Sequence, residues 1–192
     1  MDDYAALFEL GVADYFTAFG HRFARERPHQ AWLLNCVSRR IDPQLVVAEL
    51  TVPNQDLSRF AAIEGSSEGG ANFDFAITWS EIDLRTWKTR TPGWKSGEST
   101  VPNTLDTLRD VAVLAEFKVS ESTSTNVSAL RKDLEKLRAA IGFMVHHDCK
   151  SLPACFLVVF DSQRVLDTRK AVESVASNWP PCAALPKILV GP

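Results

Sequence analysis

The chain has 192 residues, 45% of them hydrophobic, and a formal net charge of −3. A chain of this length and composition can bury one sizeable core, so we predict a single domain over residues 1–192. The small net charge excludes a uniformly basic surface. It neither supports nor excludes DNA as a partner, and any contact with nucleic acid has to come from a local patch.

The cysteines and the hydropathy pattern predict a reduced protein away from the membrane. The four cysteines are widely spaced and show neither the paired spacing of a zinc site nor the density of a disulfide scaffold. The chain opens with the acidic stretch MDDY, which argues against a signal peptide. No apolar run approaches the roughly 20 residues of a membrane helix. We therefore predict a cytoplasmic location and no membrane partner.

The first third of the chain is predicted to hold a helical segment and a hairpin. Apolar residues recur at helical spacing over 3–27, as one long helix or two short ones, with Gly11 and Gly20 as weak points and Pro28 just beyond. Residues 31–40 and 45–53 read as two strands joined by an Asp-Pro turn.

Strands and helices are predicted to alternate in the rest of the chain. A long excursion, residues 81–110, separates two of these strands. The predicted elements are a strand at 73–79, a strand at 111–119, a helix at 127–143, a strand at 154–160, a helix at 164–179 and a strand at 187–191. This order predicts an α/β fold with a mixed central β-sheet flanked by helices.

The apolar strand 111–119 carries Glu116 and Lys118, which point to the same face because strand residues alternate. Such a pair is either a solvated ion pair, worth roughly 0–1 kcal/mol, or part of a site. An acid-x-Lys triplet is expected about once by chance, and a second one, Asp148 to Lys150, lies in a polar stretch that reads as a loop. The apolar setting of the first triplet favours the site.

Asp74 lies near the start of the preceding strand, so antiparallel pairing would bring it to Glu116. The stretches "NFDFAI" and "LAEFK", with the order of helix, strands, helix and strand around them, resemble the PD-(D/E)xK nuclease superfamily. The resemblance covers roughly residues 3–160 and implies the restriction-endonuclease-like fold. Asn72 and Phe73 stand where that motif often has a proline, and the gap from Asp74 to Glu116 is longer than usual.

This resemblance implies phosphodiester hydrolysis of DNA. Asp74 and Glu116, with the carbonyl of Phe117, would hold one or two Mg²⁺ ions, for which Mn²⁺ can substitute. Lys118, kept protonated by the two carboxylates, would orient the attacking water or neutralise the phosphate.

Members of the superfamily often add a glutamate from the first helix. Glu9 is the preferred candidate for this metal ligand, because it is a lone acid in an apolar helical stretch. The competing candidates are Glu26, Glu49 and Glu64, and a plain surface glutamate remains an alternative for Glu9.

Basic and aromatic residues suggest where DNA would lie. The excursion interleaves lysine, arginine and tryptophan, which suit phosphate contacts and base stacking, although the tryptophans would equally suit packing on the protein body. Lys132 and Lys136 on the helix 127–143 either touch phosphate or lie on a solvated face. The predicted nucleic-acid contacts are Arg85, Trp87, Lys88, Arg90, Trp94, Lys95 and Lys132.

Two other functions fit the same residues. A catalytically inactive member of the fold would bind nucleic acid or a protein partner. Alternatively, Glu116 and Lys118 form only an ion pair, and the chain is an interaction module such as an inhibitor or immunity protein. A homodimer is a further expectation, because many such nucleases pair to cut both DNA strands.

Overall fold

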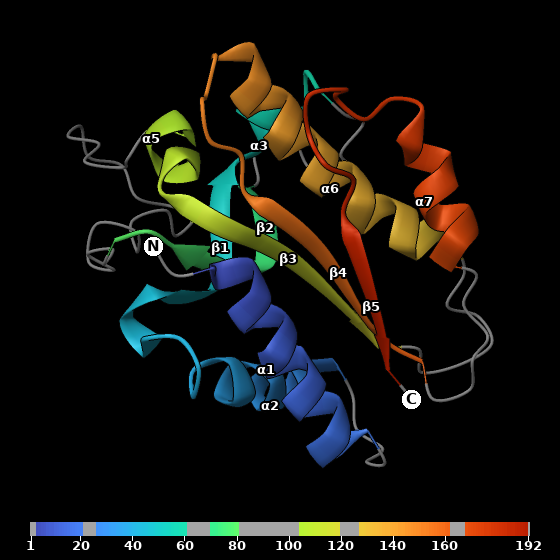
Figure 1. Cartoon of the computed structure of the whole chain (residues 1–192). Coiled ribbons are helices and arrows are strands. Elements are labelled where there is room, and N and C mark those ends of the chain that lie inside the picture. Colours follow the sequence, from blue (N-terminus) through green and yellow to red (C-terminus); the bar gives the residue numbers. More distant parts are fainter. Residues whose placement is uncertain are drawn as a thin grey trace, which may run out of the picture.

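Five strands form one mixed sheet at the centre of the computed structural model (Figure 1). The structure describes residues 3–20, 26–60, 70–80, 104–119, 127–161 and 168–191. The strands lie side by side in chain order: β1 (Val46–Pro53), β2 (Gly70–Thr78), β3 (Val111–Val119), β4 (Ala154–Phe160) and β5 (Lys187–Gly191). The pairs β1–β2 and β2–β3 are antiparallel, whereas β3–β4 and β4–β5 are parallel.

Helices cover both faces of this sheet, which confirms the predicted α/β class (Figure 1). On one face lie α1 (Tyr4–Phe19) and α2 (Glu26–Val37). On the other lie α3 (Asn54–Leu57), α6 (Val127–His146) and α7 (Thr168–Ala176). The short helices η1 (Pro43–Leu45) and α5 (Thr104–Arg109) lead into β1 and β3.

Strand β3 is buried on both faces, which explains its nearly continuous apolar run. Val113, Ala115 and Phe117 pack into the core beneath α1 and α2. Leu114, on the opposite face, packs into the core beneath α6. Because side chains alternate along a strand, Glu116 points to the α6 face of the sheet, where a charged group is out of place without partners.

The prediction of a strand at 31–40 is wrong, because these residues belong mostly to helix α2. The side chains that α2 buries, His29, Leu33, Cys36 and Val37, follow helical spacing. Pro28 lies in the first turn of α2, where its missing N–H has no helical partner to lose. It therefore marks the start of a helix and not the end of one.

The other predicted elements are confirmed to within a few residues. The N-terminal segment is two helices, with Gly20 at the C-cap of α1 as expected of a weak point. The expected weak point at Gly11 is wrong, because α1 runs through it without a break. Of the excursion 81–110, the structure describes α5 and the turn to β3, and residues 81–103 lie outside the described residues. The confirmed elements are the strands at 45–53, 73–79, 111–119, 154–160 and 187–191 and the helix at 127–143. Of the helix predicted at 164–179, the structure shows Thr168–Ala176, and residues 164–167 lie outside the described residues.

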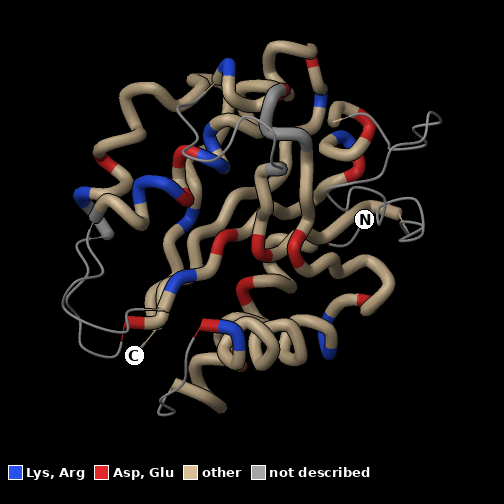
Figure 2. The backbone as a smooth tube through the Cα atoms, turned by 180° about the vertical axis from the view of Figure 1, so that it is seen from behind, with Lys and Arg blue, Asp and Glu red and all other residues tan. Residues whose placement is uncertain are grey.

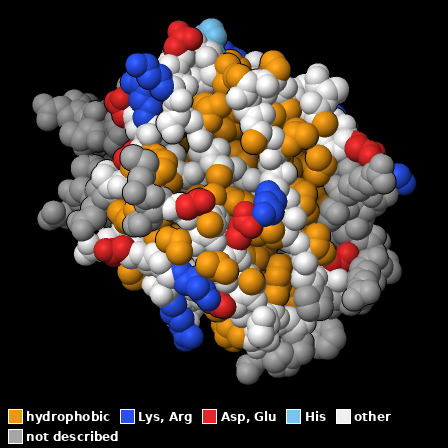
Figure 3. Space-filling model, in the orientation of Figure 1, with side chains coloured by type: hydrophobic (Ala, Val, Ile, Leu, Met, Phe, Trp, Pro, Cys, Tyr) orange, Lys and Arg blue, Asp and Glu red, His pale blue; other side chains and the backbone are white. Residues whose placement is uncertain are grey.

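Hydrophobic side chains are interspersed with polar and charged ones on the face seen in Figure 3. Among the most exposed large hydrophobic residues are Leu10 of α1 and Val190 of the edge strand β5.

The four cysteines are free, and burial raises the pKa of the Cys155 thiol to about 12. Among the described residues, no helix is both long and apolar enough to span a bilayer.

A Gly11→Ala substitution is predicted to destabilise the protein, although alanine is the better helix former by about 1 kcal/mol. A Cβ at Gly11 would lie 2.9 Å from both Cα and Cγ2 of Val37 in α2, and the backbone cannot give way cheaply. We expect a loss of about 1–3 kcal/mol in the free energy of unfolding, measured by urea denaturation. Ala13 is an exposed position of α1, where helix propensity alone decides. Ala13→Gly should therefore lower the free energy of unfolding by about 1 kcal/mol. A gain in stability with Gly11→Ala would contradict this close contact of α1 and α2.

Candidate functional site

Strands β2 and β3 separate at the predicted motif. Their pairing runs from Thr78 and Val111 to Phe75 and Ala115 and stops there. Beyond that point the backbone N–H of Phe117 donates a hydrogen bond to Oδ2 of Asp74, 2.7 Å away. The Asp74 carboxylate thus takes the place of a backbone acceptor. The structure brings Asp74 to the Glu116–Lys118 stretch, as the antiparallel arrangement predicts.

A reversal of the side-chain alternation in β1 and β2 accompanies this separation. Val47 and Leu50 of β1 both face the α6 core, although a regular strand would place them on opposite faces. Glu49 lies between them and has a left-handed backbone with φ of 57°. The pairing of β1 with β2 skips this position and resumes at Leu50 and Phe73. In β2, Phe73 faces the α6 core and Phe75 the α1 and α2 core. Asp74 therefore lies where the strand changes face, and its carboxylate reaches both β3 and α2.

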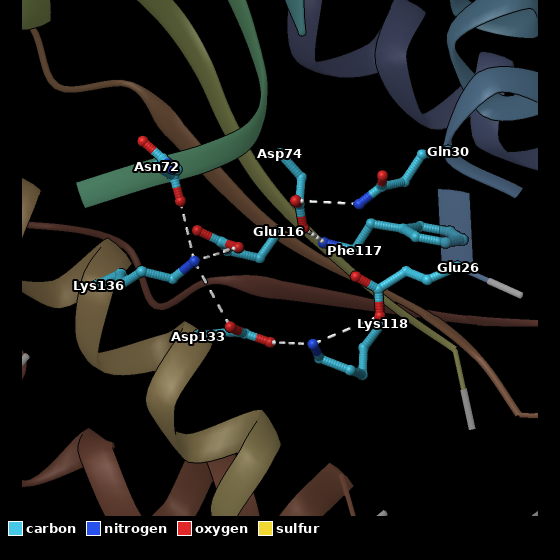
Figure 4. A network of polar contacts seen from close by, with 9 residues as sticks. All are labelled: Glu26, Gln30, Asn72, Asp74, Glu116, Phe117, Lys118, Asp133 and Lys136. Atoms are coloured by element: carbon cyan, nitrogen blue, oxygen red, sulfur yellow. Dashed lines mark hydrogen bonds and ion pairs between the residues drawn. The ribbon is translucent and has the colours of Figure 1, made fainter. Parts of the chain in front are cut away.

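Helix α2 fixes the second oxygen of Asp74. Nε2 of Gln30 donates a hydrogen bond to Oδ1 of Asp74 at 3.0 Å. Both carboxylate oxygens thus have a donor, one from α2 and one from β3, and the carboxylate is held in one orientation (Figure 4). The sequence analysis missed Gln30 because it read the following residues as a strand.

Glu116 is almost completely buried, with 1% of its surface exposed. Its Oε2 accepts a hydrogen bond of 2.7 Å from Nζ of Lys136, whereas Oε1 has no hydrogen-bond partner among the described residues. Burial raises the pKa of Glu116 well above its ordinary value; Lys136 opposes the shift, and Asp133 and Asp74 add to it. One lysine is therefore not enough to offset the cost of burying this carboxylate.

Lys136 lies among oxygens from β2, β3 and α6 (Figure 4). In addition to Glu116, its Nζ donates to the backbone carbonyl of Asn72 at 3.0 Å and lies 3.6 Å from Oδ1 of Asp133. Burial lowers the pKa of Lys136, but the neighbouring Glu116 and Asp133 carboxylates outweigh it, and the net pKa is raised. Lys136 is thus cationic in the folded protein.

Lys118 occupies the other side of the same cluster. Its Nζ lies 3.5 Å from Oε2 of Glu26 and 3.5 Å from Oδ2 of Asp133. Burial lowers the pKa of Lys118, and Asp133, Glu26 and Asp74 together outweigh that effect and raise it. Lys118 is protonated as predicted, but Asp133 and Glu26 contribute most to this in place of the expected pair of Asp74 and Glu116.

Asp133 of α6 is a site residue that the sequence analysis missed. It is 8% exposed, burial raises its pKa, and its Oδ2 has no hydrogen-bond partner among the described residues, with Lys118 at ion-pair distance. One signal was present in the sequence. Position 133 falls three residues after Leu130 and four before Leu137, inside the apolar stripe of the helix.

The cluster carries more negative than positive charge. Four carboxylates face two ammonium groups, so the sum is −2 if all of them are ionised. Figure 2 shows several acidic positions close together in the middle of the chain trace. The residues of the cluster are Glu26, Asp74, Glu116 and Asp133 with Lys118 and Lys136. A divalent cation would balance this charge.

The donors suit Mg²⁺, but Lys136 stands among them. Carboxylate and carbonyl oxygens are the ligands that Mg²⁺ prefers, and Glu116 and Asp133 each have a buried oxygen without a hydrogen-bond partner. Across the described ranges, however, no three His, Cys, Asp or Glu side chains already form a metal-binding group. The donor types suit a metal ion, and Lys136 occupies the place beside Glu116 that such an ion would take.

The preference for Glu9 over Glu26 does not agree with where the two glutamates lie. Glu9 of α1 forms an ion pair with Lys187 of β5, on the opposite face of the sheet from Glu116. Glu26, at the start of α2, is the helix glutamate that reaches the cluster, through Lys118. Of the other competitors, Glu49 is exposed on β1, and Glu64 lies outside the described residues.

The predicted nucleic-acid contacts fall almost entirely outside the described residues. Lys132 is exposed on α6, one turn before Lys136. The second acid-x-Lys triplet, Asp148 to Lys150, lies in the turn after α6, as predicted for a loop. The contacts that lie outside the described residues are Arg85, Trp87, Lys88, Arg90, Trp94 and Lys95.

Comparisons of the chain with protein-family models, with curated proteins and with solved structures give no match. The functional argument therefore depends on the chemistry of the site itself.

Proposed function

We propose that the chain has the restriction-endonuclease-like fold and hydrolyses DNA phosphodiesters with the help of Mg²⁺. The observation that carries this proposal is the cluster where β2 and β3 separate, in which four carboxylates face two lysines. The order of elements around the motif supports the fold. DNA as the substrate and a homodimer as the active assembly belong to the same proposal.

In this proposal the acidic residues hold the metal ion. Asp74, Glu116 and the carbonyl of Phe117 are the ligands, and Asp133 contributes its buried oxygen. Gln30 and the Phe117 N–H keep the Asp74 carboxylate in a fixed orientation, which limits the reorganisation needed on binding. The chemistry that Mg²⁺ supplies when bound is a water of lowered pKa and neutralisation of the negative phosphate; Mn²⁺ can serve in its place.

Lys118 is the catalytic cation. Its ammonium group is kept protonated and is held by ion pairs from α2 and α6, at 3.5 Å each. From there it donates hydrogen bonds to a phosphate oxygen or to the attacking water and offsets the negative charge that develops on the phosphate. Glu26 thus positions Lys118, and Asp133 both positions Lys118 and contributes to the metal site.

A second candidate function is a catalytically inactive module that binds nucleic acid or a protein. One observation favours it: Lys136 already donates to Glu116 at 2.7 Å and so offsets part of the charge that a metal ion would balance. In that case the cluster is a permanent structural ion-pair network, and the wild-type protein binds no divalent ion at the site.

Cleavage assays separate the two functions. Purified wild-type protein and Glu116→Gln are incubated with supercoiled plasmid, single-stranded DNA and RNA in Mg²⁺, in Mn²⁺ and in EDTA. We expect the wild type to cut DNA with either metal and not in EDTA, and Glu116→Gln to be inactive. Equal cutting by both proteins would indicate a contaminant. No cutting of any substrate by the folded wild type would favour the binding module.

A further inference from the structure

Lys136 is surrounded by oxygen atoms in the way that a bound cation is. Its Nζ lies 2.7 Å from Oε2 of Glu116, 3.0 Å from the carbonyl oxygen of Asn72 and 3.6 Å from Oδ1 of Asp133. These acceptors come from β3, β2 and α6, and Glu116 is a proposed metal ligand. The ammonium group therefore takes up the electrostatic role of a metal ion between the separated strands (Figure 4).

The two lysines of the cluster are not equivalent. Nζ of Lys136 donates a hydrogen bond to the most buried carboxylate, that of Glu116. Nζ of Lys118 lies 3.5 Å from the carboxylates of Glu26 and Asp133, at ion-pair distance and without a contact to Glu116 among the described interactions. Only Lys136 therefore competes directly with a metal ion for an oxygen of Glu116.

Lys136 also has a path away from the site. Its side chain is 21% exposed, compared with 1% for Glu116, and it stands on a flexible four-carbon stem. Such a side chain can turn toward solvent while the backbone of α6 stays in place. Exchange of the ammonium for another cation thus needs a rotamer change only.

We propose that Lys136 is a built-in counterion that holds Glu116 in the metal-free protein and withdraws when a divalent ion binds. This inference rests on the proposed function, since it assumes the metal site. Because the contacts of Lys136 must break first, they lower the affinity for the metal. They also stabilise the metal-free fold by offsetting buried negative charge.

The test measures metal binding and stability, independently of cleavage. Mn²⁺ is titrated by calorimetry into the wild type, Lys136→Met and the control Lys150→Met, which removes an exposed lysine in the turn after α6. We expect Lys136→Met to bind Mn²⁺ about 5- to 100-fold more tightly than the wild type, and Lys150→Met to bind it like the wild type. The midpoint of thermal unfolding of Lys136→Met should be lower in EDTA and should rise more with Mn²⁺.

The alternative outcomes are distinct. Wild-type binding with unchanged or weaker affinity in Lys136→Met would overturn the counterion role and leave the proposed function standing. No Mn²⁺ binding by the wild type or by Lys136→Met would overturn both. Binding by Lys136→Met alone would show that Lys136 blocks the site permanently, and it would overturn both its withdrawal and the proposed function. If Lys136→Met does not fold, Lys136→Gln keeps a hydrogen bond to Glu116 without the charge, and the same increase in affinity is expected.

Discussion

A Lys118→Ala substitution is expected to reduce the rate of metal-dependent DNA cleavage by at least about 100-fold, the usual effect of removing a group that stabilises transition-state charge. Lys118 is the cation held within the acidic cluster by Glu26 and Asp133. The initial rate of nicking of supercoiled plasmid in saturating Mg²⁺ measures this effect.

The chain provides a matched control for this substitution. Lys150 belongs to the second acid-x-Lys triplet and lies exposed in the turn after α6. Lys150→Ala should cleave at the wild-type rate. Lys118→Ala should also bind Mn²⁺ at least as well as the wild type, because it loses a positive charge near the metal ligands. Equal rates for the wild type and Lys118→Ala would show that Lys118 has no part in the chemistry.

A Glu116→Gln substitution is expected to abolish metal binding and yet to stabilise the metal-free protein by about 1–2 kcal/mol at neutral pH. Glu116 is buried with one oxygen lacking a hydrogen-bond partner among the described residues, and its pKa is raised in the folded state. A neutral amide avoids the cost of burying that charge and still accepts a hydrogen bond from Lys136. Urea unfolding in EDTA measures the difference.

The pH dependence of the free energy of unfolding tests independently whether Glu116→Gln stabilises the metal-free protein. The folded state holds the Glu116 proton at pH values where the unfolded chain, with a pKa near the ordinary 4.5, has released it. The wild type therefore loses stability as the pH rises from about 4.5 toward the folded pKa, and Glu116→Gln lacks this loss. The advantage of Glu116→Gln over the wild type in the free energy of unfolding should therefore increase from pH 4 to pH 8.

Glu135 serves as the control for buried acids in general. It is also nearly buried and accepts a hydrogen bond of 2.7 Å from a cation, Arg138 on the same helix. Glu135→Gln removes an ordinary ion pair without relieving an excess of negative charge, so it should lower the stability slightly. A loss of stability in Glu116→Gln as large as that in Glu135→Gln would contradict the proposed charge excess at Glu116.

The strands and the motif were accessible from the sequence because they depend on local patterns. The run around Glu116 has the length and composition of a central strand, and the two charges in it have no place in a purely structural core. Asp74 was predicted by the same argument, because it is a charged residue in the apolar strand that precedes the strand of Glu116. The proximity of Asp74 to Glu116 is a prediction that the Phe117 N–H contact confirms.

Helix α2 was misread because its evidence is ambiguous at short range. Trp32, Leu33 and Leu34 are consecutive, and a short apolar run suits either a strand or a helix. Pro28 fits the end of a preceding helix as well as the first turn of the next. Because of this error, Gln30 was not predicted. Glu9 was preferred because it is a lone acid in an apolar helical stretch, and its partner Lys187 is too distant in the sequence for any local pattern to reveal.

The helix residues of the site needed the three-dimensional structure. Helical spacing places Asp133 in the apolar stripe of α6 but does not reveal its partners. Lys136 is one of several alternating charges on α6, and that pattern is typical of a solvated face. The packing of α6 against β3 and the separation of β2 from β3 place Asp133 and Lys136 beside Glu116. Tertiary geometry of this kind is not encoded in helical spacing alone.

A metal site at the separation of β2 and β3 is tested most directly by a crystal structure grown with Mn²⁺, in which anomalous scattering locates the ion. We expect a peak beside the carboxylates of Asp74 and Glu116, with Nζ of Lys136 turned away from Glu116. Crystals at saturating Mn²⁺ with no peak there, and with Lys136 still bonded to Glu116, would contradict the metal-dependent mechanism and leave the cluster as a structural ion-pair network.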